Sequence, residues 1–187
     1  MRRGFTLVEF VIVLMILGIV AAISVTIIQQ SVQTLVDSGA RQRLAANAAL
    51  INHQISRALR DALPGSVRVL SGGRCIEWMP IIAASRYTNL TVVAASNSFT
   101  ALSYGSAQSG RVAVYPLPGG NLYSLANPGP LTAGVATLPA GNSVTVNLAA
   151  SHTFPVESPS RRFFLVDTPE AFCQQGGFLY HFEIYGT

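Results

Sequence analysis

The most unusual residue of this sequence is Glu9, a carboxylate directly before residues 10–28, nineteen positions without a charged side chain. A charge at the centre of a membrane helix costs on the order of ~3 kcal/mol, and less near its end, so such a residue needs a partner. A cut between Gly4 and Phe5 would create an α-amino group about one helical turn before Glu9. We expect this amine to pair with Glu9, within one chain or between staggered chains. The alternative is that Glu9 extends toward lipid headgroups.

Cys75 and Cys173 are the two cysteines of the chain, so one disulfide pairing is possible. We expect this bridge because the later part of the chain is predicted to lie outside the cytoplasm, where disulfides persist. It would close a loop of about a hundred residues and contribute ~4.7 kcal/mol in the chain-entropy treatment. The alternative is two buried free thiols. A zinc site is not expected, since neither cysteine has a second ligand nearby in the sequence.

The three histidines, His53, His152 and His181, are isolated from one another along the chain. His181 and Glu183 alternate on a predicted strand and would share one face, which could form an acid–base pair. The simpler interpretation, an exposed polar face, is favoured. No Gly-x-Ser-x-Gly nucleophile motif and no phosphate-binding P-loop occurs. We therefore predict no enzyme, no cofactor and no small-molecule substrate.

Ligand sites built from other side chains are also not expected. The carboxylates beyond residue 64 are too dispersed for a calcium site: Glu77, Glu157, Asp167, Glu170 and Glu183. Trp78 with Tyr87, Tyr104 or Tyr123 could form an aromatic patch for glycans, but such residues more often lie in a core. The sequence thus predicts no metal site and keeps an adhesive surface as an alternative.

The composition limits the class of protein. The chain has 187 residues, of which 50% are hydrophobic and 11% are charged, against about 25% charged in ordinary soluble domains. This chain is too apolar to be disordered, and only one of its apolar runs approaches membrane-spanning length. Its 12 arginines and 8 acidic residues give a net charge of +4. The arginines are scattered rather than clustered, so nucleic-acid binding is not expected.

The uncharged run of residues 10–28 is long enough for one membrane-spanning helix. Arg2 and Arg3 precede it and favour a cytoplasmic N-terminus. A secretory signal peptide carries its cleavage site after the apolar region, whereas here the polar-to-apolar junction comes before it. We expect a single-pass protein whose remaining chain lies outside the cytoplasm.

The segment GFTLVE, after a short basic leader and before an apolar run, resembles the signal of the type IV pilin family. The resemblance implies that a prepilin peptidase cuts between Gly4 and Phe5 and methylates the amine of Phe5. It also implies that Glu9 neutralises the Phe5 amine of a neighbouring subunit during assembly. Gly18 matches the family's helix glycine. Thr26 departs from the proline of many major pilins, so the local melting of the helix associated with that proline is not carried over.

The helical pattern continues beyond the membrane segment. Apolar residues recur at spacings of three and four: Leu44, Ala48, Ile51, Ile55, Leu59 and Ala62. Pro64 and Gly65 end the pattern, and Gly39 is a plausible bend. We predict a leader over residues 1–4 and a helix over residues 5–63. About residues 5–30 form its membrane and assembly half, and about residues 31–63 form an amphipathic half.

Residues 64–187 change to a period of two and are predicted to form a β-rich head. Eight strands are expected, over residues 66–70, 74–82, 90–94, 98–104, 111–115, 143–148, 162–166 and 178–185. Residues 115–142 are rich in Gly and Pro and are predicted as loops. The predicted fold class is α+β, with the helix packed on an antiparallel sheet as in the type IV pilin fold.

Parts of the head carry a narrower resemblance. The segments RALRDALPGSVRV, CIEWMPIIAASRY, SPSRRFFLVDTPEAFC and GFLYHF resemble minor prepilins of mannose-sensitive haemagglutinin (MSHA) pili, of the MshO subtype. This implies a minor subunit that is inserted in the bacterial inner membrane with its head in the periplasm. It would then join or initiate a pilus on the cell surface, through contacts of its N-terminal helix with other pilins. The alternatives are a minor pseudopilin of a type II secretion system and a displayed adhesin or DNA-uptake subunit.

Overall fold

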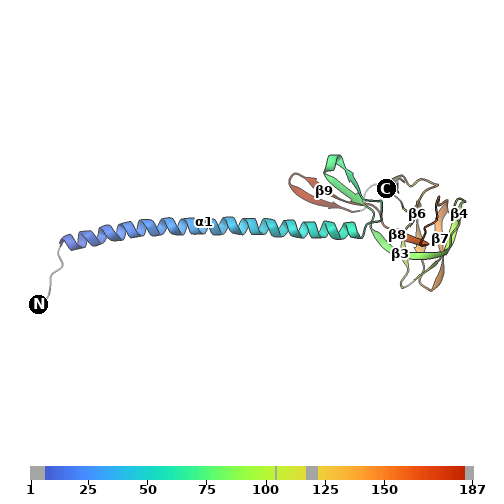
Figure 1. The fold of residues 1–187 in the computed structure, drawn as a ribbon, viewed down its shortest axis with the longest axis horizontal. Coiled ribbons are helices and arrows are strands. Elements are labelled where there is room, and N and C mark those ends of the chain that lie inside the picture. Colours follow the sequence, from blue (N-terminus) through green and yellow to red (C-terminus); the bar gives the residue numbers. More distant parts are fainter. Residues whose placement is uncertain (1–6, 104, 117–121, 184–187) are drawn as a thin grey trace. The chain divides into compact units, whose positions relative to one another are not determined.

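The structure is a computed structural model that describes residues 7–103, 105–116 and 122–183 (Figure 1). The chain divides into two compact units, residues 1–53 and residues 54–187. The first consists of helix α1 up to its last two turns. The second contains the end of α1 and all the strands, and we refer to it as the head.

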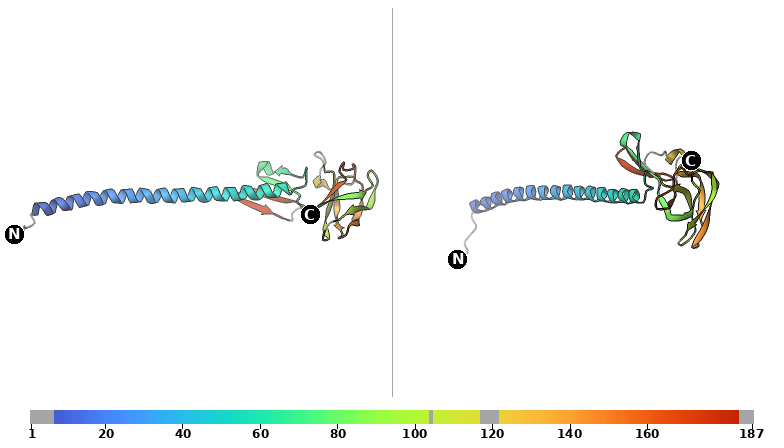
Figure 2. Two further views of the ribbon diagram at one scale, coloured as in Figure 1. Left: turned by 60° about the horizontal axis from the view of Figure 1, so that its bottom comes forward. Right: turned by 45° about the vertical axis from the view of Figure 1, so that its right-hand side comes forward.

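Helix α1 (Leu7–Arg60) is one uninterrupted α-helix of 54 residues (Figures 1 and 2). It passes through Gly39 without a break in its helical structure. The helix ends three residues before the predicted position. The backbone N–H of Leu63 donates to Met79, and that of Ile81 donates to Asp61. These hydrogen bonds replace the last helical turn, and Pro64 could not have continued it.

The head contains a four-stranded antiparallel sheet. Its strands are β1 (Arg68–Leu70), β2 (Cys75–Trp78), β9 (Glu170–Gln175) and β10 (Phe178–Phe182), in the order β1-β2-β9-β10. A 3-10 turn, η1 (Ser71–Gly73), joins β1 to β2. Gly176 and Gly177 join β9 to β10 and both have positive φ, as a two-residue type I′ hairpin turn requires. The hairpin therefore forms without strain at its turn.

The other six strands close into a barrel in the order β3-β4-β7-β6-β5-β8. They are β3 (Ile81–Asn89), β4 (Ser96–Leu102), β5 (Gln108–Val114), β6 (Leu131–Leu138), β7 (Ser143–His152) and β8 (Arg162–Val166), with a 3-10 turn, η2 (Leu122–Ser124), before β6. All the neighbouring strands are antiparallel. The core is fully buried at Val112, Val146 and Leu165, and Phe99 packs edge-to-face on Phe163 with ring centroids 5.2 Å apart. Closure leaves this sheet without an exposed edge.

The α+β class and the long helix followed by antiparallel sheets agree with the prediction. The expectation of one sheet was wrong. The predicted strand over residues 74–82 is two strands, because it breaks at Met79 and Pro80, which separate β2 from β3. Pro80 has no N–H to donate to a sheet. The chain can therefore change direction there and leave the open sheet for the barrel.

Other predicted strands also differ from the structure. Residues 90–94 form no strand, only an isolated bridge between Val92 and Phe154. Strands β6 and β9 were not predicted; β6 lies inside the Gly- and Pro-rich region expected to be loops. Predictions over residues 104, 117–121 and 184–187 lie outside the described residues. A second core cluster of Leu63, Met79, Leu122, Leu131 and Val166 packs the end of the helical segment against the barrel.

Candidate functional site

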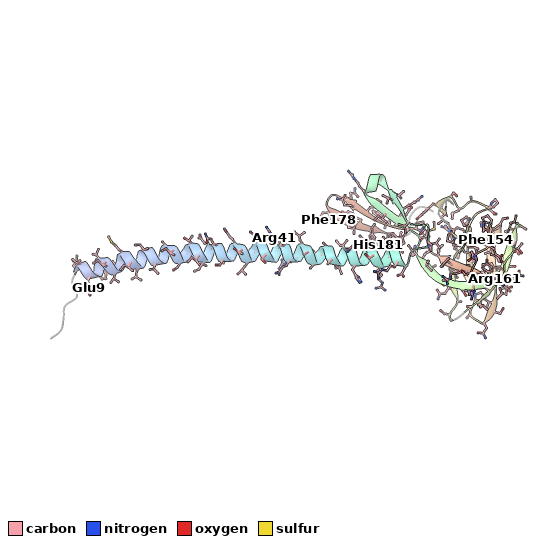
Figure 3. The ribbon with its side chains drawn as sticks, viewed as in Figure 1. Glu9, Arg41, Phe154, Arg161, Phe178 and His181 are labelled. Atoms are coloured by element: carbon pink, nitrogen blue, oxygen red, sulfur yellow. A yellow bond between two sulfur atoms is a disulfide. The ribbon has the colours of Figure 1, made fainter. Side chains whose placement is uncertain are left out.

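The predicted processing site, Gly4 and Phe5, lies outside the described residues. Glu9 is in the first turn of α1, where its side chain is exposed (Figure 3). The N-terminus of a helix carries a partial positive charge, so a carboxylate in its first turn is favoured. The structure thus places Glu9 at the end of the helix that adjoins the processing site.

The surface of α1 is apolar on all sides over its first thirty residues. Each large apolar side chain from Leu7 to Val36 is exposed, with Leu7 at 81% and Met15 at 67%. Soluble monomers rarely expose contiguous apolar patches larger than a few hundred Å². Within the described part of the chain, α1 is the one helix long and apolar enough to cross a membrane. This surface requires lipid or other helices of the same kind.

Hydroxyl groups in this helix satisfy their hydrogen bonds locally. Ser24, Thr26, Ser31 and Thr34 each donate to the carbonyl oxygen four residues earlier, over 2.8 to 3.0 Å. In lipid no water can serve these groups, so internal bonding is required. At Thr26, where many major pilins have proline, the helix is intact and its hydroxyl bonds to Ala22.

The predicted disulfide partners lie on neighbouring strands of the four-stranded sheet. Cys75 on β2 is directly opposite Cys173 on β9, and the structure joins them by a disulfide with Cα atoms 4.1 Å apart. The bond therefore crosses the two central strands of this sheet. It connects residues that are 98 positions apart in sequence.

A charged cluster lies near the disulfide, and no sequence pattern predicted it. Arg68 on β1 bonds to Glu77 on β2, whose side chain is almost fully buried, and Arg68 also lies 3.4 Å above the ring of Tyr123. The Tyr123 hydroxyl donates to the carbonyl of Ser66 over 2.6 Å. Burial is the main cause that raises the pKa of Tyr123 well above its ordinary value. The charge of Glu77 adds to this effect and that of Arg68 opposes it. The cluster fastens the η2 segment to the edge of the sheet.

His181 is not isolated in the folded head. Its Nε2 lies 3.0 Å from Glu170 on β9, and its Nδ1 lies 3.3 Å from Glu183. Its ring stacks on Phe172 and Trp78, with centroids 4.5 and 6.0 Å apart. The sequence identified Glu183 as a neighbour but missed Glu170, because Glu170 is brought close only by pairing of β9 with β10.

His181 also lines a groove of about 430 Å³ within the head, beside Arg57 and Asp61 at the end of the helical segment. Trp78, which the sequence analysis considered for a glycan-binding patch but expected more often in a core, is 1% exposed, so its ring belongs to the core. In the described residues, no three side chains of His, Cys, Asp or Glu are arranged to hold a metal ion.

Residues 1–25 match the family described as the prokaryotic N-terminal methylation motif. The match covers Gly4, Phe5 and Glu9, and the first part of the exposed apolar helix. It supports a type IV pilin-like protein that is processed by a peptidase and anchored in a membrane through α1. No curated protein and no solved structure matches this chain significantly. The family match therefore supports an assignment for the N-terminal segment alone. It does not extend to the head.

Proposed function

We propose that this chain is a structural minor subunit of a type IV pilus of the MSHA kind, nearest to the MshO subtype. The observation that carries the proposal is the methylation motif, residues 1–25, which includes the start of a 54-residue helix whose large apolar side chains from Leu7 to Val36 are all exposed. Before assembly such a surface is covered by lipid. In a filament it would be covered by the helices of neighbouring subunits. A helix of this kind suits a subunit that leaves the bilayer for a helical bundle.

The proposed maturation takes place at the N-terminus. A prepilin peptidase cuts between Gly4 and Phe5 on the cytoplasmic face of the inner membrane and methylates the new amine of Phe5. The head lies in the periplasm and is later displayed on the cell surface. An oxidising compartment on that side of the membrane agrees with a disulfide between Cys75 and Cys173.

Glu9 would guide assembly by charge. Its carboxylate lies in the first turn of the helix, four residues after the proposed new amine. Inside a lipid or helix-bundle environment, an amine and a carboxylate attract each other strongly because the local dielectric constant is low. A subunit that enters a filament would place its Phe5 amine against Glu9 of a neighbour and so neutralise both charges.

The role of a minor rather than a major subunit rests on two features of the sequence. Thr26 replaces the proline of many major pilins, and the head is large. The MSHA and MshO assignment rests on the four head segments quoted above. A minor pseudopilin of a type II secretion system would share the same N-terminus, so an experiment must separate the two.

The decisive experiment is to shear surface filaments from the native cell and measure intact subunit masses. We expect a mass that corresponds to the chain from Phe5 onward, with one added methyl group and two hydrogens lost to the disulfide. The major pilin in the same sample would identify the pilus. A processed chain retained only in the inner membrane would favour the pseudopilin. A chain that still begins at Met1 in a cell with active peptidase would overturn the pilin proposal.

A second experiment tests Glu9 directly. Glu9→Ala is expected to insert into the membrane normally but to be depleted from sheared filaments. Asp37→Ala is the matched control, because it removes an exposed carboxylate from the same helix outside the motif. Equal recovery of the Glu9 variant and the control in filaments would mean that charge pairing does not drive assembly.

A further inference from the structure

The open sheet of the head has two edges, and exposed apolar side chains gather at both. Ten large apolar side chains are exposed in the described residues beyond Arg60, and six of them lie at these edges. Those six are Val67 and Val69 at the β1 edge and Phe178, Leu179, Tyr180 and Phe182 on β10. In the described part of the chain, β1 pairs only with β2 and β10 only with β9. Both edges therefore offer backbone groups for pairing with another strand.

The β10 edge lacks the usual protection against pairing, whereas β1 is only three residues long and carries Arg68. Natural edge strands are blocked by lysine, proline, a bulge or an inward-pointing charge. Strand β10 has none of these: its five residues include no proline, and its register with β9 is continuous from Phe178 to Phe182. The side chain of His181 is already held by Glu170 and Glu183. An apolar, unprotected edge is typical of a strand that pairs with a partner.

The directions of the two edge strands decide which partner fits. All three pairings in the sheet are antiparallel, so β1 and β10, first and fourth in the order, run in opposite directions. A second copy in the same orientation therefore presents its β1 antiparallel to β10 of the first copy. The sheet then continues from one head into the next without reversal of either chain.

The side chains of the two edges also match face by face. Val69 is in line with Ile76, Phe172 and His181 across the sheet, so it lies on the same face as Leu179. On the opposite face, Leu70 of one edge corresponds to the three aromatic rings of the other, while Arg68 already contacts Glu77 and Tyr123 of its own chain. Apolar side chains on neighbouring strands are favourable neighbours. The disulfide across β2 and β9 holds both edges in one rigid sheet.

We propose that the heads of two copies of this chain join edge to edge, β10 of one with β1 of the next. Figure 3 marks Phe178 and His181 on the β10 strand that would form this contact. The contact is head-to-tail, so it leaves a free edge at each end and can repeat. Because β1 has only three residues, the contact is weak by itself. It needs the high local concentration of chains anchored in one membrane, and in this respect it rests on the proposed function.

Cysteine cross-linking of the full-length chain in its membrane tests this contact. The chain that carries both Val69→Cys and Leu179→Cys should oxidise to a ladder of dimers, trimers and longer products. Each single variant should stay monomeric, and a mixture of the two single variants should stop at a dimer. Tyr180→Lys, which adds a protecting charge to the edge, should abolish the ladder. The emission of Trp78 checks that each variant is folded.

A matched pair, Val135→Cys on β6 with Val156→Cys between β7 and β8, controls for random collision, because these valines are comparably exposed in the head. A ladder of equal yield from this pair, or no ladder from the edge pair, would overturn the proposal. Dimers from one single variant would show a two-fold contact instead, and cross-links to a different protein would exclude a second copy as partner. Intact masses of the chain from the same cells distinguish failure of this contact between heads from failure of the proposed pilin function. A processed, methylated chain without a ladder would refute the edge contact alone.

Discussion

Removal of the disulfide should destabilise the head by an amount that depends on the length of the loop that the bond closes. Cys75 and Cys173 are 98 residues apart, and they join the two central strands of the open sheet. In the chain-entropy treatment, closing a loop of this length restricts the unfolded chain by about 4.7 kcal/mol at 25 °C. The folded sheet keeps its backbone hydrogen bonds when the bond is absent. The Cys75→Ser and Cys173→Ser double variant should therefore fold but unfold more readily.

The assay is urea unfolding of the full chain in mild detergent, followed by tryptophan fluorescence. Trp78 is the single tryptophan, is buried, and lies on β2 three residues after Cys75, so its emission reports the state of this sheet. With a denaturant slope of about 2 kcal/mol per molar urea, the midpoint should fall by roughly 2 M. Reduced wild type should behave like the double variant. A midpoint within about 0.5 M of oxidised wild type would refute the reasoning that the bridge restricts a long loop.

Three further predictions concern packing, pH and the helix. Phe163→Ala should lower the stability of the head by about 3–5 kcal/mol, because the ring is fully buried; the exposed Phe178→Ala should change the same urea midpoint little. The stability of the wild-type head should fall above about pH 10. Above this pH the hydroxyl group of Tyr123 is deprotonated in the unfolded chain but still protonated in the folded head, because its pKa is raised there. Unfolding therefore releases a proton, and a rising pH favours unfolding. Tyr123→Phe should reduce the fall of the free energy of unfolding with pH by at most about 1.4 kcal/mol per pH unit. An unchanged pH dependence would exclude Tyr123 as its source. Gly39→Ala should strengthen the helix by about 1 kcal/mol, because no atom lies within 4 Å of the added methyl group; slower amide exchange around residue 39 would show this, and faster exchange would contradict it.

The N-terminal segment could be interpreted from the sequence because its information is local. A charged motif before an uncharged run predicts processing and membrane insertion without reference to any distant residue. The period of the apolar residues then extends the helix as far as Pro64. The three-residue error at its end arose from long-range hydrogen bonds between residues 61–63 and 79–81, which no local pattern contains.

The head was predictable as β-rich, but not as two sheets. Alternation of apolar and polar residues identifies a strand, whereas the partner of each strand is decided by contacts between distant segments. Strand β6 lies in a Gly- and Pro-rich region, and its strand geometry depends on pairing with β5 and β7. Strand β9 lacks a clear alternation and is fixed by its place between β2 and β10.

The sequence by itself therefore determined the prepilin signal, the membrane helix, the α+β class and the single possible cysteine pairing. Only the tertiary structure decided that Cys75 and Cys173 are direct neighbours across two strands, and that Glu170 approaches His181. It alone also showed that, among residues 7–103, 105–116 and 122–183, β1 and β10 are the edge strands of one sheet while the other six strands close into a barrel. The physical reason is that side-chain periodicity is encoded along the chain. Strand pairing is instead selected by the burial and hydrogen bonding of the whole fold.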